Sequence, residues 1–241
     1  MAVLDVANVT IEREGLPIVR DTSISVEEGA ITVLLGVNGA GKTTLLEGIS
    51  GAIDIVAGGI HLDGHNISKQ QPYQRARGGI AHVEQGRSIF GELTTLENLQ
   101  VAAPDNSCDE AFDMFPELAK RRDIASGLLS GGEQQMLVLA RAFLRRPRAL
   151  LIDELSLGLS PRALERLMDS VRELRDAGPG ILLVEQFASL ALEIGNTAAV
   201  LRSGSIAYHG TCAELRDDPD LLHELYLGSG EDSEPRSEAR A

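Results

Sequence analysis

Three short runs of the sequence contain the residue types that handle phosphate groups, and they follow one another in a set order. Residues 36–43 read Gly-Val-Asn-Gly-Ala-Gly-Lys-Thr, a complete G-x-x-x-x-G-K-[ST] phosphate-binding pattern. Residues 129–135 read Leu-Ser-Gly-Gly-Glu-Gln-Gln, and the apolar run 150–152 ends in the carboxylates of Asp153 and Glu154. Together these runs predict a site that binds and cleaves a nucleoside triphosphate.

The phosphate-binding loop has the flanking pattern of a strand, a turn and a helix. An apolar run at residues 30–35 precedes it, and glycines permit the backbone angles and close approach that such a loop needs. We expect the Lys42 ammonium to reach the β- and γ-phosphates and the Thr43 hydroxyl to bind Mg²⁺. A glycine-rich turn with an exposed lysine is the alternative, and the complete spacing disfavours it. The residues predicted to contact ATP here are Gly36, Asn38, Gly39, Ala40, Gly41, Lys42, Thr43 and Thr44.

The two carboxylates stand at the end of a buried strand predicted over residues 149–152. Ligands of open α/β sheets bind beyond the carboxyl ends of the parallel strands. We therefore expect Asp153 to hold Mg²⁺, through water, and Glu154 to polarise the water that attacks the phosphate. In isolation, the same pair would indicate only a solvated acidic strand end.

The elements that must position these residues alternate between strand and helix patterns. Residues 3–26 alternate in polarity about a turn near Glu14 and Gly15, which predicts a β-hairpin. A mixed helical pattern occupies residues 93–123, broken by prolines. Ser160 is the expected N-cap of a helix that begins at a proline. Further strands are predicted over residues 59–64, 79–83, 181–184, 197–201 and 205–208, and helices over 131–144, 161–176, 187–194 and 212–227.

Composition and charge limit the function classes. The chain has 241 residues, 43% hydrophobic residues and a net charge of −14, so it supports a real core and disfavours nucleic acid as a partner. The two cysteines and five histidines show no metal-type spacing. The N-terminus lacks a secretory pattern, and no apolar run reaches the roughly 18–20 residues that span a bilayer. Work at a membrane would therefore need another subunit to cross it.

The run at residues 129–135 resembles the signature of ATP-binding-cassette (ABC) ATPases. In that family two cassettes pair head to tail, and the signature of one protomer closes over the γ-phosphate held by the other. The resemblance implies that Ser130, Gly131 and Gly132 contact ATP bound to a partner protomer, at the positive end of a helix. Ser130 and Glu133 also fit a simple helix capping box. That interpretation leaves the paired glycines and the two glutamines unexplained.

Three further residues take their roles from the same resemblance. Gln85, within residues 83–90, is similar to the Q-loop glutamine that contacts Mg²⁺ and the attacking water, in a loop that faces the transmembrane partner. Gln186 stands where most ABC ATPases have a switch histidine, and it either donates an amide N–H to the γ-phosphate or simply starts a helix. Arg13 stands where an aromatic residue usually stacks on adenine. Stacking by the guanidinium and a plain surface arginine are equally open interpretations.

The sequence also departs from the common pattern at positions that link protomers. Leu155 replaces the proline that normally follows the catalytic glutamate, and Ser160 replaces the aspartate of the D-loop. The region between residues 99 and 114 looks short. These differences put the coupling between protomers in question and leave the phosphate chemistry intact.

Longer stretches at residues 92–99, 114–118 and 130–161 resemble the ATPases of branched-chain amino-acid importers. The resemblance implies an α/β, ABC-type P-loop NTPase with a RecA-like core, an antiparallel β subdomain and a helical subdomain. The ATPase domain would span residues 1–227, with the helical subdomain inserted at about 91–145. The acidic stretch 228–241 lacks apolar periodicity and is expected to be a disordered tail.

The function implied by the resemblance is an ATPase that uses ATP and Mg²⁺ to power uptake of branched-chain or related hydrophobic amino acids. The expected partners are a second copy or a homologous ATPase subunit, an integral membrane permease and, indirectly, a solute-binding protein. The protein would be cytoplasmic and peripheral on the inner face of the cell membrane. Urea or short amides are alternative substrates. A non-transport ABC ATPase or a regulatory nucleotide-binding subunit is the alternative function, disfavoured by the single cassette and by the intact Glu154.

Overall fold

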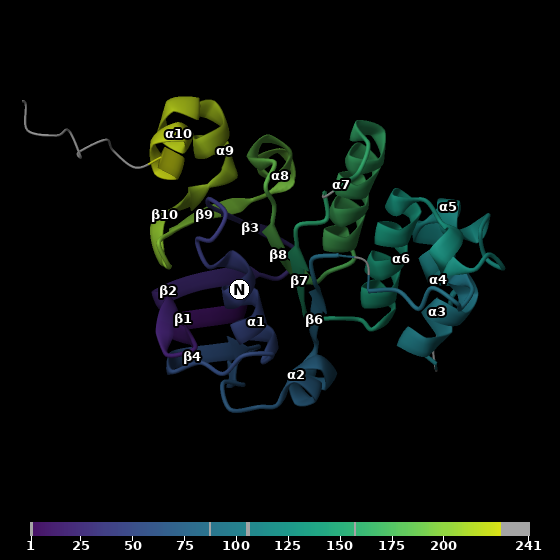
Figure 1. The fold of residues 1–241 in the computed structure, drawn as a ribbon, viewed down its shortest axis with the longest axis horizontal. Helices are drawn as coiled ribbons and strands as arrows, with labels where there is room; N and C mark the ends of the chain where they lie inside the picture. Colours follow the sequence, from purple (N-terminus) through teal and green to yellow (C-terminus); the bar gives the residue numbers. More distant parts are fainter. Residues whose placement is uncertain (1, 87, 105–106, 157, 228–241) are drawn as a thin grey trace, which may run out of the picture.

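The computed structural model describes residues 2–86, 88–104, 107–156 and 158–227, which form two β-sheets with helices around them (Figure 1). The expected acidic tail lies outside the described residues. The antiparallel sheet, in the order β2-β1-β4-β5, consists of β1 (Ala2–Arg13), β2 (Leu16–Glu27), β4 (Ala57–Leu62) and β5 (His65–Asn66). The second sheet, in the order β10-β9-β3-β8-β7-β6, consists of β3 (Ile31–Leu35), β6 (Ile80–Val83), β7 (Ala149–Asp153), β8 (Gly180–Val184), β9 (Thr197–Arg202) and β10 (Ser205–Thr211).

The strands at the centre of the second sheet pair in parallel. Every residue of β3, β7 and β8 is buried, as expected of strands covered on both sides. Successive residues of β3 point into two different hydrophobic clusters. Val33 packs in the cluster beneath α6 and α7, and Leu34 packs in the cluster that faces the antiparallel sheet. The predicted hairpin and the predicted parallel strands are confirmed, and the α/β class with them.

Helices cover both faces of the second sheet. Helix α1 contacts β1, β2, β6 and β7 and so lies between the two sheets, whereas α6 and α7 lie against the opposite face, and α9 and α10 beside β9 (Figure 1). Ser160 caps α7, as predicted, by accepting a hydrogen bond from the backbone N–H of Ala163 at 3.4 Å. The bounds are α1 (Lys42–Ser50), α2 (Pro72–Gly78), α6 (Gly131–Leu144), α7 (Pro161–Asp176), α8 (Ala188–Ile194), α9 (Cys212–Asp217) and α10 (Pro219–Leu227).

A group of short helices packs against α6 on the side away from the sheets (Figure 1). These are α3 (Thr95–Ala102), α4 (Asp109–Met114) and α5 (Pro116–Ala119), followed by a 3-10 turn at Ser126–Leu128. The buried side chain of Asn98, on α3, joins these helices to the segment around Phe90 that precedes them and to the 3-10 turn. Its oxygen accepts from the N–H of Phe90 at 3.0 Å and its amide donates to the Ser126 hydroxyl at 3.1 Å. The predicted helical pattern is therefore confirmed as several short helices.

Helix α2 is not predicted by the sequence pattern, and one buried arginine explains how it is held. The Arg75 side chain is only 1% exposed. It donates to the carbonyls of Gly48 at 2.7 Å and Ile49 at 2.9 Å, which end α1, and to those of Ser68 at 2.8 Å and Gln70 at 3.0 Å. Because the last carbonyls of a helix lack partners within the helix, Arg75 supplies a C-terminal cap from a distant element. Burial lowers the pKa of its guanidinium, opposed by the charge of Asp54.

Replacing Arg75 with methionine is expected to lower the free energy of unfolding by roughly 3–5 kcal/mol, because four carbonyls each lose a charged donor. Urea unfolding monitored by circular dichroism measures this. Arg77→Met is the matched control, since Arg77 lies on the same helix and is exposed, with its guanidinium carbon 5.9 Å from the centre of the Tyr73 ring. The control should change stability by less than about 1 kcal/mol. Equal losses for the two variants would contradict the capping role.

Candidate nucleotide-binding site

The phosphate-binding loop connects β3 to α1 and requires glycine at two positions. Gly36 has a φ of 147°, and a Cβ there would collide with the carbonyl oxygen of Leu201 on the neighbouring strand. Gly41 has a φ of 107° and is the N-cap of α1. Since a glycine cap offers no side chain, the first N–H groups of α1 are left to a bound anion. The loop has the geometry of an anion site.

Lys42 lies folded over this loop. Its ammonium donates to the carbonyl of Gly36 at 2.7 Å and to that of Val37 at 3.2 Å, and the residue is only 6% exposed. Burial lowers the pKa of the ammonium, while the charges of Glu154 and Asp153 raise it. A phosphate offers charged acceptors that are stronger partners than these two carbonyls. The predicted contact of the Lys42 ammonium with the β- and γ-phosphates stays a prediction.

Asp153, at the end of β7, is a buried carboxylate near the Thr43 hydroxyl. It is 1% exposed, and within the part of the chain that the structure describes neither of its oxygens has a partner with hydrogen-bond geometry. Burial raises its pKa most, whereas the nearby Thr43 hydroxyl and the Lys42 charge lower it. A buried carboxylate without donors is costly unless a cation accompanies it. Together, the oxygens of Asp153 and Thr43 suit Mg²⁺, which prefers hard oxygen ligands.

Glu154 and Gln85 meet at the open side of the same loop. The Gln85 amide donates to the Glu154 carboxylate at 2.9 Å, and Glu154 has a left-handed backbone with a φ of 44°. Both residues face a pocket of ≈ 340 Å³ that the phosphate-binding loop also lines. Ile18 of β2 forms part of its wall, which sequence reasoning missed because an apolar residue in a hairpin carries no functional signal. The lining residues are Ile18, Asn38, Gly39, Gly41, Lys42, Thr43, Thr44, Gln85 and Glu154.

Gln186 faces the other side of Glu154. It lines a neighbouring pocket of ≈ 430 Å³ together with Glu154, Ser156 and Phe187. Glu154 lines both pockets, whereas Gln186 lines only the second. The predicted contact between Gln186 and the γ-phosphate stays a prediction.

The signature residues lie apart from the loop of their own chain. Ser130 caps α6 by accepting from the N–H of Glu133 at 3.3 Å, and the Glu133 carboxylate accepts from the N–H of Ser130 at 2.8 Å. The capping box is therefore confirmed. None of Ser130, Gly131 and Gly132 is among the residues that line the described phosphate-loop pocket. The predicted contact between these residues and ATP held by a second protomer stays a prediction.

Arg13 is attached to α1 beside the pocket. Its Nε donates to the Thr44 hydroxyl at 3.2 Å, and its guanidinium forms an ion pair with Glu47. Arg13 does not line the pocket itself, although Thr44 does. Stacking of Arg13 on adenine therefore stays a prediction, and the ion pair supports the surface-arginine interpretation.

An α/β sheet with a glycine loop before α1 and two carboxylates after β7 defines a P-loop nucleoside triphosphatase. A family model described as ABC transporter matches residues 19–156. The chain belongs to the ABC transporter family, and it is an ATPase that binds ATP. Within the described residues, no helix has the length and apolar character needed to cross a membrane.

Several proteins with known names are similar along most of the chain. The branched-chain amino acid transport ATP-binding protein BraG of Pseudomonas aeruginosa is 38% identical, covering 86% of this chain and 92% of BraG. The probable branched-chain amino acid transport ATP-binding protein LivF of Archaeoglobus fulgidus is 39% identical, covering 88% of this chain and 91% of LivF. The lipopolysaccharide export ATP-binding protein LptB of Escherichia coli K12 is 33% identical, with 95% of this chain and 98% of LptB covered.

A solved structure confirms the expected fold. The crystal structure of a nucleotide-free ATP-binding cassette from an ABC transporter superposes with a TM-score of 0.84, at 24% sequence identity, covering 95% of this chain and all (100%) of that chain. The ABC-type P-loop fold predicted from the sequence is therefore confirmed.

Proposed function

We propose that this chain is the ATP-hydrolysing subunit of an importer of branched-chain or related hydrophobic amino acids. The similarity to BraG and LivF along most of their lengths carries this proposal. The site supports catalysis, since Lys42, Asp153 and Glu154 stand together at the phosphate-binding loop. The similarity to LptB, at lower identity, makes lipopolysaccharide export the second candidate.

The proposed chemistry is mainly positioning and charge stabilisation of a transferring phosphoryl group. Lys42 and the N–H groups at the start of α1 hold the β- and γ-phosphates. Thr43, Asp153 and Gln85 would hold Mg²⁺, which neutralises charge on the phosphates. Glu154 accepts a proton from the attacking water, and the amide of Gln186 donates to the γ-phosphate.

A second protomer completes the proposed site. The signature residues Ser130, Gly131 and Gly132 do not line the phosphate-loop pocket of their own chain. Ser130 is exposed at the N-terminus of α6, a helix end that attracts anions. We propose that two copies, or one copy and a homologous subunit, place each signature over the ATP held by the other.

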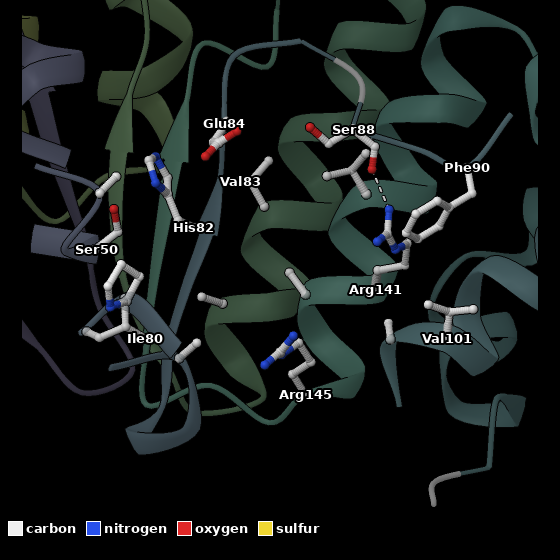
Figure 2. A pocket seen from close by; sticks show the side chains of 17 residues that line it. Ser50, Ile80, His82, Val83, Glu84, Ser88, Phe90, Val101, Arg141 and Arg145 are labelled. Carbon is white, nitrogen blue, oxygen red and sulfur yellow. Dashed lines mark hydrogen bonds between the residues drawn. The ribbon is translucent and has the colours of Figure 1, made fainter. Parts of the chain in front are cut away.

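A groove between β6 and the helical group is the proposed docking surface for a membrane permease. Figure 2 shows this pocket of ≈ 540 Å³, with Phe90 and Val101 about half exposed on one wall. Arg141 donates to the carbonyl of Ser88 and lies 4.9 Å from the centre of the Phe90 ring. Ser88 and Phe90 follow Gln85 in the same segment of the chain. A partner bound in the groove would therefore affect the position of Gln85 in the catalytic site. Docking there places the protein on the inner face of the membrane, with a solute-binding protein as an indirect partner.

Transport by the reconstituted complex tests the proposal. The chain is combined with permease subunits encoded by genes beside its own. The complex is placed in vesicles, with ATP on the side of the membrane where the chain is bound. We expect ATP-dependent uptake of leucine, isoleucine or valine, together with faster phosphate release than from the chain alone. Uptake of urea or short amides, extraction of lipopolysaccharide, or ATP hydrolysis that is indifferent to every permease would each overturn the proposed substrate class.

Surface variants make the docking part of the proposal specific. Phe90→Ala is expected to keep the basal ATPase rate of the isolated chain and to lose permease-stimulated hydrolysis. Leu16→Ala is the control, since Leu16 is also an exposed apolar residue (67%) but lies on the antiparallel sheet. Equal stimulation of the two variants would contradict docking in the groove.

A further inference from the structure

The backbone turn that carries Glu154 is conformationally unfavourable. Glu154 has a φ of 44°, in the left-handed region that side chains other than glycine rarely adopt. Such a conformation persists only where the surrounding structure holds it. The residues that impose this turn therefore control where the Glu154 carboxylate stands.

Three hydrogen bonds hold the turn, and all of them run to the end of β8. The N–H of Glu154 donates to the carbonyl of Val184 at 2.9 Å. The N–H of Leu155 donates to one oxygen of the Glu185 carboxylate at 3.0 Å. The Ser156 hydroxyl donates to its other oxygen at 2.6 Å. Both oxygens of Glu185 are thus committed to the two residues that follow Glu154.

The hydrogen bond from Leu155 exists because the sequence departs from the common family pattern there. A proline after the catalytic glutamate would have no N–H to donate. Leu155 is fully buried, and its carbonyl accepts from the Gln135 amide on α6 at 3.3 Å. The backbone of one residue, Leu155, therefore joins the turn to Glu185 at the end of β8 and to α6, the helix of the signature.

Glu185 is buried as a carboxylate without a cation. It is 1% exposed and forms no ion pair within the described ranges of the chain. Burial raises its pKa, whereas the Ser156 hydroxyl and the N–H groups of Leu155, Gln186 and Ser156 lower it. The hydrogen bonds from Leu155 and Ser156 place a donor at each of its two oxygens. An amide side chain would turn its own NH₂ toward some of these donors.

We propose that Glu185 is a positioning residue for ATP hydrolysis: its buried carboxylate holds the turn that aims Glu154. The inference rests on the role proposed for Glu154. Glu185 does not line the phosphate-loop pocket, so it acts through its hydrogen bonds to Leu155 and Ser156.

The test is Glu185→Gln in the full chain, compared with wild type. We expect kcat to fall by about 10- to 100-fold, the effect of a slightly misplaced catalytic group. The KM for ATP should stay within about twofold of the wild-type value, because the phosphate loop is untouched. Amide hydrogen exchange should become faster in the peptide that contains Leu155 and stay unchanged in β3. A purely structural role would not produce this split.

Ser156→Ala provides a second variant that removes one donor and leaves the fold's apolar packing alone. Its kcat should fall less than that of Glu185→Gln. In the double variant the fold-loss in kcat should be smaller than the product of the two single-variant losses, because both substitutions remove the same contact. If Glu185→Gln fails to fold, Ser156→Ala by itself still has to lower kcat without raising KM.

The outcomes separate this inference from the proposed role of Glu154. Wild-type kcat in both variants, or a parallel loss of kcat, ATP affinity and urea resistance, overturns the positioning role. Glu154→Gln is measured beside them. If that variant still hydrolyses ATP, the role of Glu154 itself fails. If it is inactive while Glu185→Gln turns over normally, only the inference about Glu185 fails.

Discussion

Replacing Glu154 with glutamine is expected to abolish ATP turnover while ATP binding is retained. The amide has the shape of the carboxylate but cannot accept a proton from water, and loss of a general base lowers rates by about 10²- to 10⁴-fold. The contact with Gln85, now 2.9 Å from amide to carboxylate, offers the new side chain an acceptable neighbour. Removing one negative charge from the site also favours binding of the negatively charged phosphates of ATP. ATP-bound protomers should therefore accumulate as a stable dimer.

Phosphate release, nucleotide binding and size-exclusion chromatography with ATP measure these three effects. Glu165→Gln is the matched control. Glu165 lies on α7 and lines the neighbouring pocket but not the phosphate-loop pocket, whereas Glu154 lines both. It should bind ATP, hydrolyse it at the wild-type rate and form no trapped dimer. Near-normal hydrolysis by Glu154→Gln would remove the catalytic role from this residue.

Replacing Lys42 with alanine is expected to weaken nucleotide binding by about 10- to 100-fold, the range for losing hydrogen bonds to a charged group. The ammonium already lies over the phosphate loop, 2.7 Å from the Gly36 carbonyl, so the cost of ordering it is met before ATP arrives. Its loss also removes a positive charge that interacts with the carboxylates of Asp153 and Glu154, so these two groups repel the phosphates more strongly.

Titration with a fluorescent ATP analogue in the presence of Mg²⁺ measures the affinity. Lys120→Ala removes an exposed lysine at the end of α5 and should leave the affinity unchanged. An affinity for Lys42→Ala equal to that of wild type would show that the loop holds the nucleotide in some other way. Circular dichroism of the variant checks that α1 still forms.

The local chemistry of this protein could be predicted from residues that are close in sequence. The loop of Gly36 and Lys42 follows a strand and precedes a helix within a short segment, so its pattern is complete in one place. Ser130 and Glu133 form their capping box within one turn of helix, as predicted. By contrast, Arg75 caps a helix whose final carbonyls are 26 and 27 residues earlier in the chain. No local pattern could indicate such a partner.

The sequence by itself determined the order of most strands and helices, the phosphate loop and the carboxylates at the end of β7, because each depends on periodicity or on contacts between near neighbours. Only the tertiary structure decided which of these residues meet. It brought Gln85 to Glu154, left the signature away from its own phosphate loop, and set Glu185 beneath the turn of Glu154. The physical reason is that hydrogen bonds between β7, β8 and α6 join segments through the packing of one sheet. That packing depends on the whole core, and no short run of residues records it.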